Sequence, residues 1–119
     1  MVAYNFQPRF AEAVENGEKR QTIRRKGKRI HADRGDTVHL FTGMRTKKCR
    51  NLGEGICIAS QFVTISEGRA VVSGNVVIDL DRFAHRDGFE DFSEMQEWFR
   101  DTHGLPFTGK LIQWRLVRR

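Results

Sequence analysis

Alternation of apolar and polar residues with a period of two is the feature that most restricts how this chain can fold. It is clearest in the last segment, Leu111–Val117, and it recurs in several shorter segments. Such alternation is typical of strands. The segments follow one another without the regular strand–helix–strand repeat of a doubly wound parallel sheet. The pattern predicts a mainly β, α+β fold: a small mixed β-barrel of about six strands with two or more flanking helices.

The expected strands are short and mostly able to pair in antiparallel fashion. They lie at residues 22–24, 37–42, 56–59 leading into 62–65, 70–72, 76–78 and 111–117. Gly53 and Gly55 are expected to frame a turn, because glycine is common where the chain reverses. Residues 81–88 are polar and are expected to form a loop.

Two helices are expected between these strands. The first begins at Pro8, which suits the first helical position, and runs to Asn16 before Gly17. The second begins after Asp91, which can cap it with Glu94 three residues on, and it ends at 103–104.

The length of 119 residues suits a single domain spanning 1–119, and 39% hydrophobic residues suffice for one core. Apolar runs fall short of the ~20 residues that cross a bilayer, and the N-terminus does not resemble a signal peptide. We therefore expect a cytoplasmic protein without a membrane partner. Cys49 and Cys57 are expected to be free thiols, and no metal or other cofactor is indicated.

Basic residues are concentrated in one part of the chain. Residues 1–52 carry 13 Lys/Arg against 5 Asp/Glu, whereas residues 53–119 carry 8 against 10. Such clusters attract phosphate groups, although a charged run can also be only a solvated surface. The sequence predicts RNA or a modified nucleoside as partner. The expected nucleic-acid contacts are Arg20, Arg24, Arg25, Lys26, Lys28, Arg29, Lys47 and Lys48.

The segment from Gly17 to Arg24 combines a helix end with the start of a strand. Alternation places Thr22 and Arg24 on one face of this strand and Ile23 on the other. Together with Lys19 they offer a hydroxyl, an ammonium and a guanidinium, which suit an oxyanion, a phosphate or a polarised carbonyl. The alternative is an ordinary surface strand with alternating polar residues.

The string Gly17-x-Lys19-x-x-Thr22-x-Arg24, just after a short amphipathic helix, resembles the signature of the ASCH family. The later string at residues 87–89, followed by a helix and a closing strand with Trp114, resembles the second half of that family. The resemblance implies a PUA-like β-barrel. It also implies an RNA-associated cleft between barrel and helices, lined by the signature residues.

The family does not imply one activity. Some small bacterial members look like amidohydrolases that remove the acetyl group of acetylated cytidine with a Thr, a Lys and a Glu, and another member has been associated with ribonuclease activity. Carried over, Thr22 would be the nucleophile and Lys19 the base, and the acidic position falls on Asp87, one methylene shorter than Glu. Binding of RNA or a modified nucleoside is our first hypothesis, and hydrolysis is the alternative. Oligomeric state is left open.

Several further residues carry weaker signals. Asp79 and Asp81 could bind a divalent metal, but solvated strand ends are the preferred interpretation. Trp98 and Trp114 could stack a base, but their positions favour core packing. The acidic helix around residues 90–97 could instead contact a protein partner.

Overall fold

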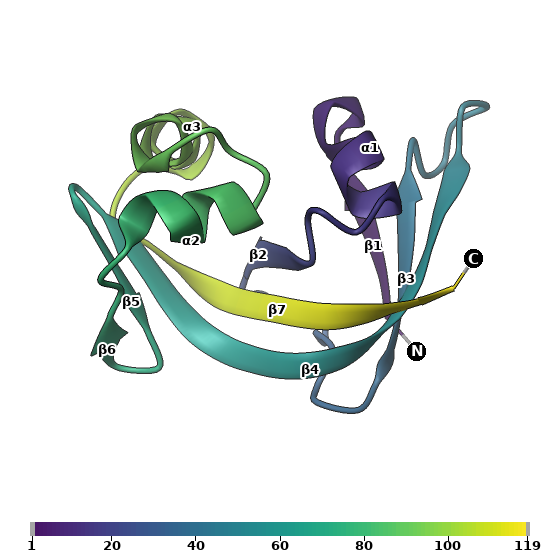
Figure 1. Cartoon of the computed structure of the whole chain (residues 1–119), viewed down its shortest axis with the longest axis horizontal. Helices are drawn as coiled ribbons and strands as arrows, with labels where there is room; N and C mark the ends of the chain where they lie inside the picture. Colours follow the sequence, from purple (N-terminus) through teal and green to yellow (C-terminus); the bar gives the residue numbers. More distant parts are fainter. Residues whose placement is uncertain (1, 119) are drawn as a thin grey trace.

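The structure is a computed structural model that describes residues 2–118. Within these residues, seven strands form one mixed sheet that curls into a half-barrel, accompanied by three helices (Figure 1). Helices α2 and α3 lie at one end of the sheet and α1 at the other, with β2 between them (Figure 1). This arrangement confirms the predicted α+β class and the barrel-like sheet.

The strands are connected mostly by antiparallel pairing. They are β1 Val2–Phe6, β2 Gln21–Arg25, β3 Thr37–Thr42, β4 Arg50–Ser66, β5 Arg69–Val72, β6 Asn75–Val76 and β7 Phe107–Arg118. The sheet order is β1-β3-β4-β5-β6, and β7 pairs with both β4 and β2. Strand β1 runs parallel to β3. Because β7 carries β2 on its second edge, the signature segment is attached to the sheet through β7.

Strand β4 is one continuous strand of 17 residues, where the sequence predicted a turn followed by two segments. Gly53 and Gly55 lie inside it, so the predicted turn at these glycines is wrong. A Cβ atom at Gly55 would lie 2.8 Å from Trp114 Cδ1 on β7. Glycine is therefore needed for close packing against Trp114, beside a register shift between the two strands.

Strand β1 was not predicted, because residues 2–6 have no clear turn signals around them. Its Tyr4 and Phe6 side chains are buried and join the hydrophobic core with Val38 and Leu40 of β3. The parallel pairing with β3 brings these residues into the sheet. This contact is long-range, so local sequence patterns do not reveal it.

Helices α1, Pro8–Glu15, and α3, Phe92–His103, confirm the two predicted helices. Asp91 caps α3 as expected, because its side chain accepts a hydrogen bond from the Glu94 N–H at 2.9 Å. The Glu94 carboxylate accepts from the Glu90 N–H at 3.0 Å, one residue before the expected partner.

Helix α2, Leu80–Arg86, corrects the prediction of a polar loop over residues 81–88. Asp79 caps this helix by accepting from the Arg82 N–H at 3.0 Å. Asp81 accepts from the Phe92 N–H at 3.0 Å and so connects α2 to α3. Buried Phe83 anchors the helix. The helix is short and mostly polar, so tertiary contacts rather than periodicity stabilise it.

Two further expectations concern the described residues as a whole. Cys49 is exposed and Cys57 is buried, and both are free thiols as predicted. No helix within residues 2–118 is both long enough and apolar enough to cross a membrane.

Candidate functional site

The signature segment lines a cavity of about 230 Å³ between α1, β2 and α3. Gly17, with a φ of 85°, turns the chain after α1, and the Lys19 N–H donates to the Ala13 carbonyl at 2.9 Å. Strand β2 then begins. Lys19, Thr22, Arg24 and Asp87 all line this cavity, so the structure brings these four candidate residues together. Ile23, predicted to point away from them, is buried yet also touches the cavity wall. We call this cavity the cleft.

Lys19 and Asp87 form a buried pair, with 3% and 5% of their surfaces exposed. Lys19 Nζ lies 3.5 Å from Asp87 Oδ1 and donates a hydrogen bond to the Asp87 carbonyl oxygen. Gln21 Nε2 donates to Asp87 Oδ1 at 3.2 Å, and Gln113 Nε2 donates to Gln21 Oε1 at 3.5 Å. The Asp87 carboxylate is thereby held at the end of α2, facing the start of β2.

Burial favours the neutral form of both members of this pair. It lowers the pKa of the Lys19 ammonium, an effect reinforced by Arg24 and Arg9 and opposed by Asp87. Burial also raises the pKa of the Asp87 carboxyl, opposed by Lys19 and by the hydrogen bond from Gln21. Desolvation is the largest cause in each case, so it favours the neutral forms. Lys19 therefore loses its proton more readily than a lysine in water.

Thr22 is positioned by Arg24. Arg24 Nε donates to Thr22 Oγ1 at 2.9 Å, and Arg24 Nη2 donates to the Asn5 carbonyl at 2.8 Å. The guanidinium also lies 5.1 Å from the ring centroids of Tyr4 and Phe6. Burial lowers the pKa of Arg24 to about 10, so it remains charged at neutral pH. Because Thr22 Oγ1 accepts from Arg24, its hydroxyl proton remains free to be donated.

Aromatic side chains make up much of the cleft wall. They are Phe6, Phe10, Phe89, Trp98, Phe99 and, at the rim, the His103 ring. Trp98 was predicted to be core; it is only partly buried, 4.9 Å from the Phe99 ring and within reach of the cleft. Trp114 is buried as predicted. Apolar walls with a few convergent polar groups are typical of small-ligand sites.

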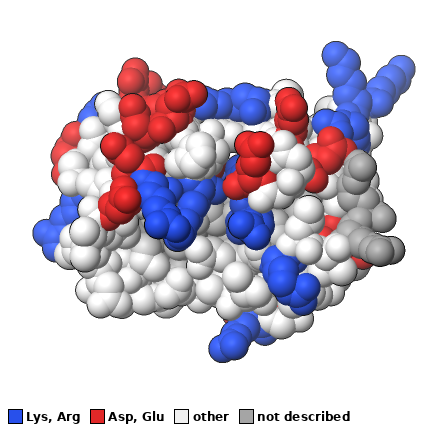
Figure 2. Space-filling view, viewed as in Figure 1, with Lys and Arg blue, Asp and Glu red and all other residues white. Residues whose placement is uncertain are grey.

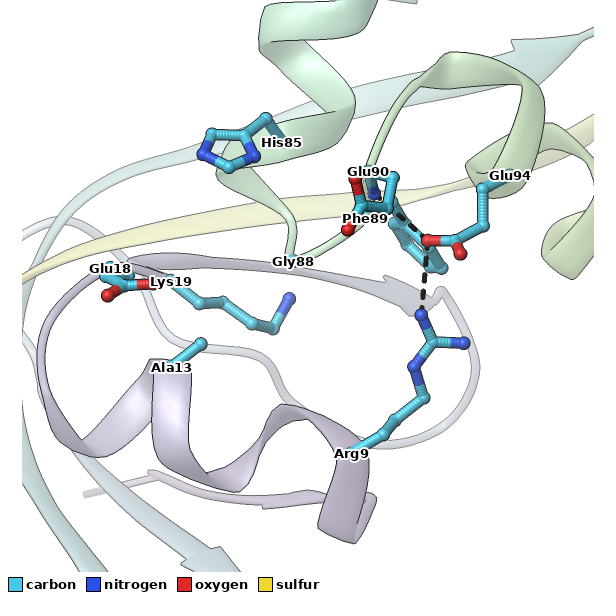
Figure 3. A pocket seen from close by; sticks show the side chains of 9 residues that line it. All are labelled: Arg9, Ala13, Glu18, Lys19, His85, Gly88, Phe89, Glu90 and Glu94. Atoms are coloured by element: carbon cyan, nitrogen blue, oxygen red, sulfur yellow. Dashed lines mark hydrogen bonds and ion pairs between the residues drawn. The ribbon is translucent and has the colours of Figure 1, made fainter.

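A second cavity, of about 220 Å³, also has Lys19 on its wall (Figure 3). Lys19 and Phe89 line both cavities. Its rim is partly acidic, carrying Glu18, Glu90 and Glu94. Arg9 Nη2 pairs with Glu94 Oε1 at 3.2 Å across this opening (Figure 3). Lys19 is thus shared by two cavities that differ in the charge of their walls.

Gly88 allows α2, α1 and Lys19 to meet. Its φ is +97°, and a Cβ atom there would lie 2.8 Å from Phe10 Cδ1 and 3.2 Å from Lys19 Cδ. Gly88→Ala should therefore destabilise the protein by about 1–3 kcal/mol more than Gly35→Ala. Gly35 is a matched control, with a φ of +94° and nothing within 4 Å of its Cβ position. Urea unfolding of both variants measures the difference, and equal losses would contradict the packing role.

The predicted nucleic-acid contacts do not all reach the cleft. Arg24 and Arg25 line it, whereas the structure places the exposed Arg20, Lys26, Lys28, Arg29, Lys47 and Lys48 outside its wall. The Arg29 side chain donates to the Ala3 carbonyl and lies 4.8 Å from the Tyr4 ring centroid. Residues 47 and 48 lie in the turn between β3 and β4, beside α1 (Figure 1). On the face in Figure 2, acidic side chains gather over α2 and α3.

Sequence reasoning missed Gln21, the residue that holds the Asp87 carboxylate. Its position offered a signal. Alternation places Gln21 on the same face as Ile23, which is buried, and a buried polar side chain needs a hydrogen-bond partner. No cluster of three or more His, Cys, Asp or Glu side chains suited to a metal ion occurs within residues 2–118.

A half-barrel whose cleft lies between α1, β2 and α3 defines a recognisable class of fold. It matches the crystal structure of a mutant of ZmASCH, an ASCH protein from Zymomonas mobilis, with a TM-score of 0.56. The match covers 98% of this chain and 72% of that chain at 16% sequence identity, a level at which likeness shows the fold alone. The expectation of an ASCH-like fold is thereby confirmed. No family model and no curated protein sequence matches the chain.

Proposed function

We propose that the cleft binds a single nucleobase, presented by RNA or by a modified nucleoside such as acetylated cytidine. The observation that carries this proposal is the convergence of Lys19, Thr22, Arg24 and Asp87 in one cavity with aromatic walls. Aromatic side chains can stack on a base, while the polar groups hydrogen-bond to its edge. Lys19 and Arg24 offer donors for carbonyl oxygens, and the Asp87 carboxylate offers an acceptor for an amine.

The size of the cleft favours one base over a longer element. A volume of about 230 Å³ lies just below the ~300–1,000 Å³ of pockets that hold drug-sized ligands. A base within RNA would have to leave its stack to enter, as occurs where proteins read unpaired RNA. The ASCH-like fold and the signature string both support a ligand of this class.

Replacing Arg24 by methionine tests the proposal, because methionine keeps an apolar stem over the Tyr4 and Phe6 rings but removes the guanidinium. We expect binding of acetylated cytidine or cytidine to weaken about 10- to 150-fold, the usual loss when a charged hydrogen bond is removed. Arg20→Met is the matched control, since Arg20 is exposed and outside the cleft wall. Titration calorimetry measures both. A wild-type protein that binds neither nucleoside nor RNA would overturn the proposal.

Hydrolysis of an acetyl amide is a second candidate function, favoured by the lowered pKa of Lys19 and by the Thr22 hydroxyl, which line the same cavity. A neutral Lys19 would take the Thr22 proton as Oγ1 attacks the amide carbonyl. It would then give that proton to the leaving amine, and water would release the acetyl group from Thr22 as acetate. Arg24 Nε, already bonded to Thr22 Oγ1, would stabilise the developing alkoxide. Asp87 opposes deprotonation of Lys19, but it can stabilise the ammonium formed during attack.

A further inference from the structure

An exposed aromatic ring with two lysines lies outside the cleft. Phe62 on β4 is 52% exposed, which is unusual for the largest apolar side chains. Lys26 Nζ lies 4.7 Å from its ring centroid and Lys110 Nζ lies 4.5 Å from it. Ile58, on the same strand, has nearly the same exposure of 51%, but no ring for a cation to face. Ile58 is therefore a matched aliphatic position with which Phe62 can be compared.

This cluster is continuous with the cleft through the sheet. Lys110 on β7 is in register with Arg24 on one side and with Phe62 on the other. Strand neighbours lie about 4.8 Å apart, so the backbones of Arg24 and Phe62 are roughly 10 Å apart across β7. Lys26 directly follows Arg25, which lines the cleft. A short path of positive charge therefore runs from the cleft to the Phe62 ring.

Charge decides by which side a polyanion could approach the cleft. The second cavity has Glu18, Glu90 and Glu94 on its wall. Arg9 pairs with Glu94 there, so the charges of Glu18 and Glu90 are left to repel phosphates. The cleft itself carries Arg24 and Arg25, and its acidic lining residue is the buried Asp87. A phosphate backbone is therefore attracted to the β2 side, toward Lys26 and Phe62, and away from α3.

We propose that Phe62, Lys26 and Lys110 form a stacking platform for the nucleotide next to the base held in the cleft. The ligand is accordingly a single strand of RNA rather than a free nucleoside. This inference rests on the proposed function, since it places the neighbour of the bound base. It adds a binding surface outside the cleft and narrows the proposed ligand from RNA or a nucleoside to single-stranded RNA.

The lysines over the ring do not prevent stacking. An exposed base–aromatic stack is worth more than a cation over an exposed ring. An incoming base would therefore displace one ammonium, and both lysine side chains are flexible enough to turn outward. The released ammonium would then meet the adjoining phosphate. Every base has a π face, so such a platform tolerates any sequence.

The test compares binding of RNA and of nucleoside by the same variants. The probe is a fluorescein-labelled oligouridine of about 4–16 nucleotides, the span that comparable small domains cover on single strands. We expect Phe62→Ala to raise the Kd for oligouridine about 5- to 150-fold and to leave the affinity for cytidine unchanged. Phe62→Trp should retain binding. Ile58→Ala, the matched control, should bind as wild type does. Lys26→Ala with Lys110→Ala should flatten the salt dependence by about 0.7 in slope, the value for the one phosphate contact that the released ammonium makes.

The outcomes separate this inference from the proposed function. If Phe62→Ala and Ile58→Ala lose the same affinity for oligouridine, or neither loses any, the stacking platform is overturned. If cytidine still binds in that case, the cleft proposal stands. Wild-type protein that binds cytidine but not oligouridine would do the same. Protein that binds neither probe overturns both. Circular dichroism checks that each variant is folded. Phe62 and Ile58 are both exposed on β4, so their replacement should leave folding intact.

Discussion

Hydrolysis of acetylated cytidine, the second function proposed above, should fall at least about 10³-fold on Thr22→Ala, with nucleoside binding largely retained. The hydroxyl is needed for covalent attack more than for ground-state recognition. In the structure, Thr22 lines the cleft and its Oγ1 accepts a hydrogen bond from Arg24 Nε. Chromatography of cytidine released from acetylated cytidine measures the rate, and calorimetry measures the affinity.

Two companion variants separate the roles within the cleft. Lys19→Arg should be as damaging as Thr22→Ala, because a guanidinium does not lose its proton at working pH. Asp87→Glu introduces the longer acid that the family resemblance implies for a hydrolase, and it should retain or raise turnover. Asp87 is buried, so the added methylene must fit into packed surroundings. The stability of the Asp87→Glu variant is therefore measured together with its turnover.

Labelled RNA incubated in parallel tests for ribonuclease activity. If wild-type protein releases no cytidine over hours at enzyme concentrations comparable to substrate, yet binds nucleoside, the hydrolase candidate fails. The cleft is then a recognition site. Cleavage of RNA that survives Thr22→Ala would assign the chemistry to other residues.

Lys19→Met should destabilise the folded protein by about 3–5 kcal/mol, because it leaves the Asp87 carboxylate buried without its cation. Adding Asp87→Asn should recover most of this loss, since both buried charges are then gone and the amide oxygen can still accept from Gln21. The surface pair of Arg9 and Glu94 is the control: Arg9→Met should change stability by no more than about 1 kcal/mol. Urea unfolding measures all four proteins.

The pH dependence follows from the direction of each pKa shift. The folded-state pKa of Lys19 lies below its ordinary 10.5, so the cost of charging it is present at neutral pH and vanishes as pH rises toward 10.5. The pKa of Asp87 lies above its ordinary 3.8, so its cost vanishes as pH falls toward 3.8. The free energy of unfolding of wild type, compared with that of the variant carrying both Lys19→Met and Asp87→Asn, should therefore be lowest near neutral pH. A flat difference between pH 4 and 10 would contradict a buried charged pair.

Several elements of the fold could be predicted because their signals are local. Asp91 and Glu94 mark the start of α3, and the period of two marks β7. Other elements could not. Strand β1 is defined by parallel pairing with β3, and α2 by its contact with α3 through Asp81. These contacts join residues far apart in the chain, so neighbouring residues carry little trace of them.

The same division holds for the cleft. The sequence by itself determined that Thr22 and Arg24 share one face of a strand, because a period of two puts alternate side chains on the same side, and that Lys19 lies just before this strand. Only the tertiary structure decided that Asp87 lies 3.5 Å from Lys19 Nζ, that Gln21 holds its carboxylate, and that Lys47 and Lys48 lie outside the cleft. The physical reason is that these residues are far apart in the sequence. Burial and charge pairing depend on which segments pack together, and the whole core sets that packing.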